Sequence, residues 1–223
     1  MLVVLDLDDT LFLERDYVIS GFRAVDRLIC NVFGISGFFE QAWDLFENGT
    51  RGHIFDEALK ALSIFEKNTV KQLVQEYRSH EPEISIEADA FDFIHNHDPK
   101  NLAIITDGYA QGQWNKIRSL CLEKYIGKIV VTDDWGREFW KPHPRAFQYV
   151  QNSFSPEDCI YIADNPQKDF KAPAELGWMP SIRIRRKGSA FESFRAGPGK
   201  RRQVHPLEPG RAGSGCGLQY SVP

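Results

Sequence analysis

The residues whose types and spacing most clearly suit catalysis or metal binding are acids close to the amino terminus. Asp6, Asp8 and Asp9 follow an apolar run at 2–5, and Thr10 comes next. A short run rich in Val and Leu predicts a strand buried on both faces of a parallel sheet. Acids have no place inside such a strand, so we expect them at its carboxyl end, where open α/β sheets place their chemistry. Carboxylates crowded in this way repel one another unless a cation lies among them.

A second apolar segment, at 102–105, ends in groups that suit an anion. It leads into Thr106, Asp107 and Gly108, which bring a hydroxyl and backbone amides to the start of a helix. Lys141 adds an ammonium group at the beginning of another predicted helix. Hydroxyl, amide and ammonium donors together are typical of a phosphate-binding site.

A third apolar segment, at 159–163, ends in Asp164, and Asp169 lies five residues further on. Parallel strands bring their carboxyl ends to one edge of a sheet, so these acids should approach Asp6. Clustered Asp oxygens without Cys or His partners favour a hard cation, and Mg²⁺ fits best. A magnesium site beside a phosphate site indicates phosphoryl transfer.

The spacing of Asp6 and Asp8 allows the two carboxylates to perform different steps of such a reaction. In an extended chain, residues two apart point to the same side. Asp6 can attack phosphorus and form an aspartyl-phosphate. Asp8 can protonate the leaving oxygen and then deprotonate water.

The elements that must position these groups alternate in type. Between the first strand and the rest, helical spacing predicts an all-helical insert with helices at 17–33, 38–46, 55–62 and 70–77, the last with Asn68 as its N-cap. Further helices are predicted at 88–97, 113–122, 144–150 and 167–176, and strands at 102–105, 129–131, 159–163 and 181–184. Strands that alternate with helices predict βαβ units and an α/β fold with a Rossmann-like parallel sheet flanked by helices.

Composition narrows the class of protein. Of 223 residues, 42% are hydrophobic and 26% charged, which is ordinary for a globular protein. No apolar run is long enough to span a membrane or to form a signal peptide, so we expect a cytoplasmic protein without a membrane partner. The net charge is −11 over residues 1–182 and +7 over residues 183–223. An acidic body with a basic tail is not typical of a specific nucleic-acid-binding protein, so we expect no such partner. The scattered Cys30, Cys121 and Cys159 predict core thiols and no zinc site.

Four segments carry a resemblance to a known family. They are D-L-D-D-T-L-F at 6–12, I-I-T-D-G at 104–108, K-P-H-P-R-A-F at 141–147 and I-A-D-N-P-Q-K-D-F at 162–170. In this order and spacing they resemble the four motifs of the haloacid dehalogenase-like hydrolase superfamily. The position of the helical insert, between the first and second motifs, is also similar to the cap of that family.

The resemblance implies a role for each motif residue. Asp6 matches the nucleophile and Asp8 the general acid and base, with its backbone carbonyl as a metal ligand. Thr106, with the Asp107 and Gly108 amides, matches the phosphate-binding position. Lys141 matches the lysine that stabilises nucleophile and phosphate. Asp164 and Asp169 match the acids that hold Mg²⁺ directly or through its outer shell. Ala163 stands where the family often has glycine.

The resemblance also implies domain boundaries. Residues 1–13 and 84–186 would form the catalytic core, 14–83 the helical cap, and 187–223 a basic, poorly ordered tail rich in Gly and Pro. Cap residues set selectivity in such enzymes, so Arg15, Tyr17, Arg51 and His53 are candidate substrate contacts, with a solvated surface role as the alternative for each.

The sequence therefore predicts a Mg²⁺-dependent phosphatase of a small phosphorylated metabolite. Sugar or polyol phosphates are the favoured substrates and nucleoside monophosphates come next. Dehalogenases of the family lack the second aspartate of the first motif, so Asp8 argues against that activity. A phosphomutase and a non-catalytic binding module stay open as alternatives. The oligomeric state is not predicted.

Overall fold

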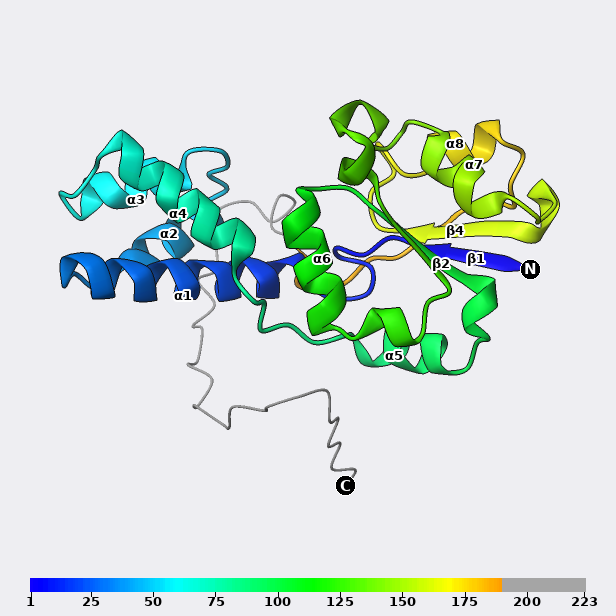
Figure 1. Ribbon diagram of the computed structural model, residues 1–223, viewed down its shortest axis with the longest axis horizontal. Helices are drawn as coiled ribbons and strands as arrows, with labels where there is room; N and C mark the ends of the chain where they lie inside the picture. Colours follow the sequence, from blue (N-terminus) through cyan, green and yellow to red (C-terminus); the bar gives the residue numbers. More distant parts are fainter. Residues whose placement is uncertain (190–223) are drawn as a thin grey trace, which may run out of the picture.

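The computed structural model describes residues 1–189 of this chain. The predicted basic tail at 187–223 therefore lies almost entirely outside the described residues. Figure 1 shows two neighbouring parts, a group of helices at the left and a sheet flanked by helices at the right. No helix within residues 1–189 combines the length and apolar character that crossing a membrane requires.

The sheet has five parallel strands in the order β3-β2-β1-β4-β5. Their bounds are β1 (Leu2–Leu5), β2 (Leu102–Thr106), β3 (Lys128–Val131), β4 (Cys159–Ala163) and β5 (Ile182–Arg183). The first strand lies at the centre, with Leu5 in register with Ile104 on one side and Ile162 on the other. The α/β fold with a Rossmann-like parallel sheet is confirmed, and the carboxyl ends of β1, β2 and β4 meet at one edge.

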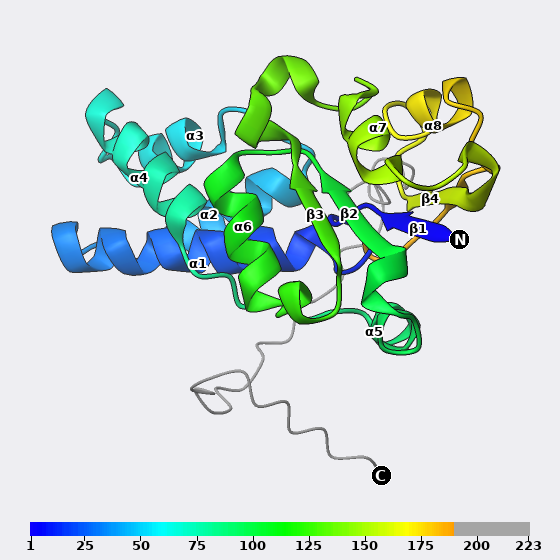
Figure 2. The ribbon, with the colours of Figure 1, turned by 45° about the vertical axis from the view of Figure 1, so that its right-hand side comes forward.

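Alternate residues of β1 supply the two faces of the sheet. Val3 and Leu5 belong to one buried cluster, and Leu2 and Val4 to the other. Because successive side chains of a strand point to opposite faces, a continuous apolar run is what a doubly covered strand requires. The helices of the sheet region are α5 (Ala88–His95), α6 (Ala110–Ser119), α7 (Arg145–Gln151) and α8 (Lys171–Glu175). Figure 2 shows α6 on one side of the sheet and α7 and α8 on the other.

Between β1 and β2 the chain forms the expected helices. They are α1 (Glu14–Phe33), α2 (Phe38–Glu47), α3 (Ile54–Ala61) and α4 (Lys67–Ser79), which we call the helical insert. Val18, Phe22, Val25 and Ile29 form the buried stripe of α1 at helical spacing. The insert has its own cluster of buried side chains, and α4 contacts α6 of the sheet region. The domain boundaries at 13/14 and 83/84 stay a prediction.

Three local predictions were wrong. Asn68 does not cap α4, because the helix begins at Lys67 and Glu66 is its N-cap. Cys30 is exposed, because it points away from the buried stripe of α1, and Cys121 is only half-buried, whereas Cys159 is buried as predicted. The helix predicted at 167–176 begins only at Lys171. Its first residues instead form a turn, in which the Asp169 amide donates to the Asn165 carbonyl at 3.0 Å.

Candidate active site

Lys141 holds the centre of the site together. Its Nζ lies 2.7 Å from Asp6 Oδ1, 2.8 Å from Asp169 Oδ1 and 3.0 Å from the Tyr161 hydroxyl oxygen. Burial by itself lowers the pKa of Lys141, but the charges of Asp6, Tyr161 and Asp169 outweigh burial and hold that pKa well above its usual value. The ammonium group is therefore charged, and it fixes one oxygen of Asp6 at the carboxyl end of β1.

Asp6, Asp164 and Asp169 form an acidic cluster. One carboxylate oxygen of each lies within 4.8 Å of the others. Burial, and next to it the charge of Asp6, raises the pKa of Asp164 to about 7. Burial also raises the pKa of Asp6 to about 6, although Lys141 acts in the opposite direction. Burial and the neighbouring carboxylates thus disfavour the charged forms of Asp6 and Asp164, and a bound cation would offset both effects.

The acidic cluster fits Mg²⁺ by the chemistry of its donors. All three side chains offer oxygen, which is the ligand that magnesium prefers. Asp169 is fully buried and already engaged, since its Oδ2 accepts from the Asn165 amide at 3.1 Å and its Oδ1 faces Lys141. Asp6 and Asp164 are therefore the better placed to contact an ion directly, with Asp169 behind them.

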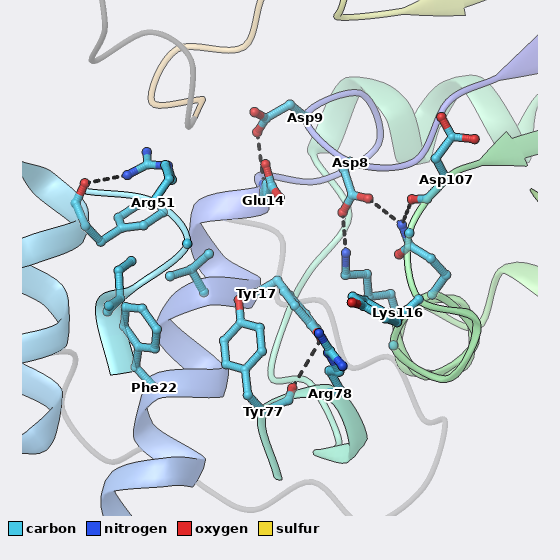
Figure 3. Close-up of a pocket in the computed structure, with 18 of the residues that line it drawn as sticks. Asp8, Asp9, Glu14, Tyr17, Phe22, Arg51, Tyr77, Arg78, Asp107 and Lys116 are labelled. Atoms are coloured by element: carbon cyan, nitrogen blue, oxygen red, sulfur yellow. Dashed lines mark hydrogen bonds and ion pairs between the residues drawn. The ribbon is translucent and has the colours of Figure 1, made fainter. Parts of the chain in front are cut away.

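Two residues of α6 orient Asp8. Lys116 Nζ lies 2.7 Å from Asp8 Oδ1, and Gln113 Nε2 donates to Asp8 Oδ2 at 2.8 Å. Lys116 is almost fully buried, and its Nζ lies 4.1 Å from the centroid of the Tyr17 ring. Figure 3 shows Asp8 reaching toward Lys116. Both oxygens of Asp8 are thus held by protein donors, which fixes the direction of this carboxylate.

The turn after β2 carries the predicted phosphate donors. Asp107 is anchored, because its Oδ1 accepts from the Thr132 hydroxyl at 2.7 Å and from the Lys141 amide at 3.1 Å. Gly108 has a φ of +129°, a conformation that favours glycine. The Thr106 hydroxyl is fully buried and accepts from Gln113 Nε2 at 3.1 Å. The Gln113 amide therefore covers Thr106 on the side of the cavity.

A cavity of about 540 Å³ joins this edge of the sheet to the helical insert. Asp6, Asp8, Asp107, Gly108 and Asp164 line one part of it, and α1, α3 and α4 contribute the other walls. Figure 3 shows Asp8 and Asp107 at one side and Arg51 and Phe22 at the other, with Glu14, Tyr17 and Tyr77 between them.

The structure separates the two predicted arginines of the insert. Arg51 lines the cavity, where its guanidinium donates to the carbonyls of Phe46 and Thr50. Arg15 does not line the cavity. It lies 3.2 Å from Glu47 and stacks on Trp43 instead. The structure therefore does not bring Arg15 to the predicted substrate contacts.

Several residues of the site were not predicted from the sequence. Gln113 and Lys116 carried a usable signal, since they lie three apart on the helix that follows the Thr106 turn and so share one face. Lys168 also lines the cavity and lies 3.6 Å from Asp107 Oδ2. Tyr161 occurs at a buried position of β4, where only the fold shows that its hydroxyl meets Lys141.

The fold and the site match one family. The model of the haloacid dehalogenase-like hydrolases matches residues 3–179. The chain therefore belongs to the haloacid dehalogenase-like hydrolases, and the predicted family and enzyme class are confirmed. The four predicted motifs lie within the matched range.

Relatives and solved structures agree with this assignment. A protein of Methanocaldococcus jannaschii named glyceraldehyde 3-phosphate phosphatase is 25% identical over 201 residues, which is 82% of this chain and 83% of the relative. The structure of a putative β-phosphoglucomutase from Thermotoga maritima has a TM-score of 0.61 at 20% identity, with 86% and 91% of the two chains covered. That of the putative hydrolase YfnB from Bacillus subtilis, described as bound to magnesium, has a TM-score of 0.55 at 24% identity, with 81% and 85% covered.

Proposed function

We propose that this hydrolase is a Mg²⁺-dependent phosphatase that cleaves small phosphate monoesters through a phosphorylated Asp6. The observation that supports it most is the pair of differently held aspartates. Asp6 is buried against Lys141, whereas Asp8 faces the same cavity two residues later. Because their surroundings differ, Asp6 can act as the nucleophile while Asp8 transfers the proton.

The reaction would proceed in two displacements. Asp6 attacks phosphorus, the bond to the ester oxygen breaks, and Asp8 gives its proton to the departing alcohol. Asp8 then takes a proton from water, the water oxygen attacks phosphorus, and Asp6 is released with inorganic phosphate. Lys141 stays charged throughout and stabilises negative charge on Asp6 and on the phosphoryl oxygens.

Mg²⁺ and the phosphate would occupy neighbouring positions. Asp6 and Asp164, with Asp169 and the Asp8 carbonyl, would hold the ion, which supplies positive charge beside the phosphoryl group. The amides of Asp107 and Gly108 would bind phosphate oxygens. For Thr106 to donate to the phosphate as well, the Gln113 amide that covers it has to move aside.

Sugar and polyol phosphates are the first substrates to test, because a similar protein is named a glyceraldehyde 3-phosphate phosphatase. Nucleoside monophosphates come second. The other activities of the family remain alternatives, since one solved structure with this fold is a putative mutase. Asp8 argues against dehalogenation, because halide departs without a proton.

The test is release of inorganic phosphate from acetyl phosphate and from a panel of phosphate esters, with and without Mg²⁺. Release that needs both Mg²⁺ and Asp6, and is lost in Asp6→Asn, is the expected result. Equal release by the Asp6→Asn protein would refute the nucleophile. Halide release from a haloacid would establish the dehalogenase instead, and an isomeric phosphosugar without free phosphate would establish the mutase.

A further inference from the structure

The cavity continues well beyond the reacting groups. Its volume of about 540 Å³ lies within the range of roughly 300–1,000 Å³ that is typical of sites for drug-sized ligands. A phosphate group with a three-carbon alcohol would fill only the part next to Asp6 and Asp8. The helical insert bounds the remainder of the cavity. The side chains that line this remainder therefore indicate the chemistry of the end of the substrate that lies away from the phosphate.

The far end of the cavity is mainly apolar and aromatic, and the Arg51 guanidinium at this end lies 4.1 Å from the centroid of the Phe46 ring (Figure 3). Phe22, Phe46 and Phe55 line it, together with Val18, Ile54 and Val74. Phe22 packs edge to face on both other rings, with centroids 6.3 Å from Phe46 and 6.1 Å from Phe55. Rings packed in this way form a firm wall. Water held against such a wall finds few hydrogen-bond partners, so an apolar group replaces it favourably.

A polar pair lies between this wall and the reacting groups. Glu14 and Tyr77 line the cavity, and Figure 3 shows both between Asp8 and Phe22. Within residues 1–189, no protein group donates a hydrogen bond to the Glu14 carboxylate, and the Tyr77 hydroxyl has no hydrogen-bond partner. Burial, followed by the charge of Asp8, raises the pKa of Glu14 to about 7. A desolvated acid of this kind gains most from a ligand that brings a hydrogen-bond donor.

We propose that the substrate is a phosphate monoester whose alcohol carries an apolar ring, with a hydroxyl or amine donor between the ring and the ester. The ring lies against Phe22, Phe46 and Phe55, and the donor bonds to Glu14. This inference rests on the proposed phosphatase activity and narrows its substrate class. Open-chain triose phosphates leave the aromatic end of the cavity empty.

Four compounds separate the parts of this proposal. 2-Hydroxy-3-phenylpropyl phosphate has the ring and the donor, 3-phenylpropyl phosphate lacks the donor, and glycerol 1-phosphate lacks the ring. Acetyl phosphate has neither and reports the basal phosphatase activity. We expect kcat/KM for 2-hydroxy-3-phenylpropyl phosphate to exceed that for glycerol 1-phosphate about 100-fold and that for 3-phenylpropyl phosphate about 10-fold. Apolar contacts and hydrogen bonds in a binding pocket discriminate between substrates by factors of about this size.

Variants assign each preference to its residue. Glu14→Gln should lower kcat/KM for 2-hydroxy-3-phenylpropyl phosphate relative to 3-phenylpropyl phosphate. Phe55→Ala should reduce the preference over glycerol 1-phosphate about 10-fold, and Phe55→Leu, which keeps the site apolar, should reduce it less. The matched control is Phe65→Ala, because Phe65 is 44% exposed and does not line the cavity. It should leave all four values unchanged.

The outcomes distinguish the two proposals. If acetyl phosphate is not hydrolysed, the phosphatase proposal fails and this inference fails with it. If acetyl phosphate is hydrolysed but glycerol 1-phosphate is used as well as the phenyl compounds, only this inference is overturned. Equal preferences in the Glu14 and Phe55 variants and in the wild type would also overturn it.

Discussion

Asp6 and Asp8 are two residues apart and have different surroundings. Lys141 and Asp169 enclose Asp6, while Lys116 and Gln113 hold Asp8 at the cavity. The two carboxylates are therefore held by different partners and can perform different steps. This difference in environment, rather than the number of acids, supports a nucleophile beside a separate general acid.

Asp8→Asn tests the proton transfer. Because asparagine cannot donate the proton, cleavage of an alkyl phosphate should fall by roughly 10²–10⁴-fold. With acetyl phosphate the first step should be much less affected: Asp6 attacks phosphorus, the bond from phosphorus to the acetate oxygen breaks, and acetate departs with little need of a proton. Rapid-quench measurement of the first turnover with both substrates checks this. An equal loss in the first step for both would show that Asp8 has another role.

The positions of the acids at strand ends could be predicted, but their supporting contacts could not. An apolar run that stops at an acid is visible in the sequence, as at Leu5 and Asp6. The contact of Lys116 with Asp8 depends on the rotation of α6 about its axis and on its distance from β1. Neither the rotation nor the distance can be predicted from the local sequence pattern.

At the scale of elements, α1 and α4 approach each other closely at Gly21. A Cβ at this position would run into the ring of Tyr77 and come within 3.2 Å of His80. Tyr77 cannot turn away freely, because its ring packs on Tyr17, Phe22 and Phe55. The absence of a side chain at Gly21 thus lets α4 bring Tyr77 to the cavity.

Gly21→Ala should therefore destabilise the protein. Overpacking costs about 1–3 kcal/mol, which should exceed the gain of about 1 kcal/mol in helix propensity. Urea unfolding measures the net change. The matched control is the same substitution in a Tyr77→Ala protein, where the obstacle is gone and Gly21→Ala should become stabilising. The same effect in both proteins would contradict this packing.

Element boundaries show where local patterns lose their value. Helical spacing identified all four helices of the insert, because each buries one stripe. The helix expected from Gln167 begins at Lys171, because the preceding residues turn back so that the Asp169 carboxylate accepts from the Asn165 amide. Arg15 directly follows Glu14, and successive residues of a helix point in different directions. Only Glu14 faces the cavity, which the rotation of α1 decides.

At the scale of the whole molecule, the acids of the site make stability depend on pH and metal. The pKa of Asp164 is raised to about 7 and that of Asp6 to about 6, from 3.8. A carboxyl group with a raised folded pKa contributes stability that is present below its unfolded pKa and lost as pH rises through its folded pKa. The free energy of unfolding of the metal-free protein should thus decrease between about pH 4 and pH 7.

Mg²⁺ should reverse this loss. Ions bind the deprotonated carboxylates of the folded protein and stabilise it by mass action. The rise in Tm on adding Mg²⁺ should be several degrees at about pH 8 and much smaller at about pH 5. Asp164→Asn removes one ligand and should abolish most of the rise, while Asp158→Asn, at the other end of β4, serves as the control. A rise that is independent of pH and of Asp164 would place the ion elsewhere.

The central claim is that Asp6 carries the phosphoryl group, and the most direct measurement is to trap it there. Asp8→Asn protein mixed with acetyl phosphate and Mg²⁺ should accumulate the intermediate, because the general base for its hydrolysis is missing. After an acid quench, peptide mass spectrometry should find one hydroxylamine-labile phosphoryl group on Asp6, and none in the Asp6→Asn, Asp8→Asn double variant. Phosphate released by the wild type with no such adduct, or an adduct on another residue, would contradict the account.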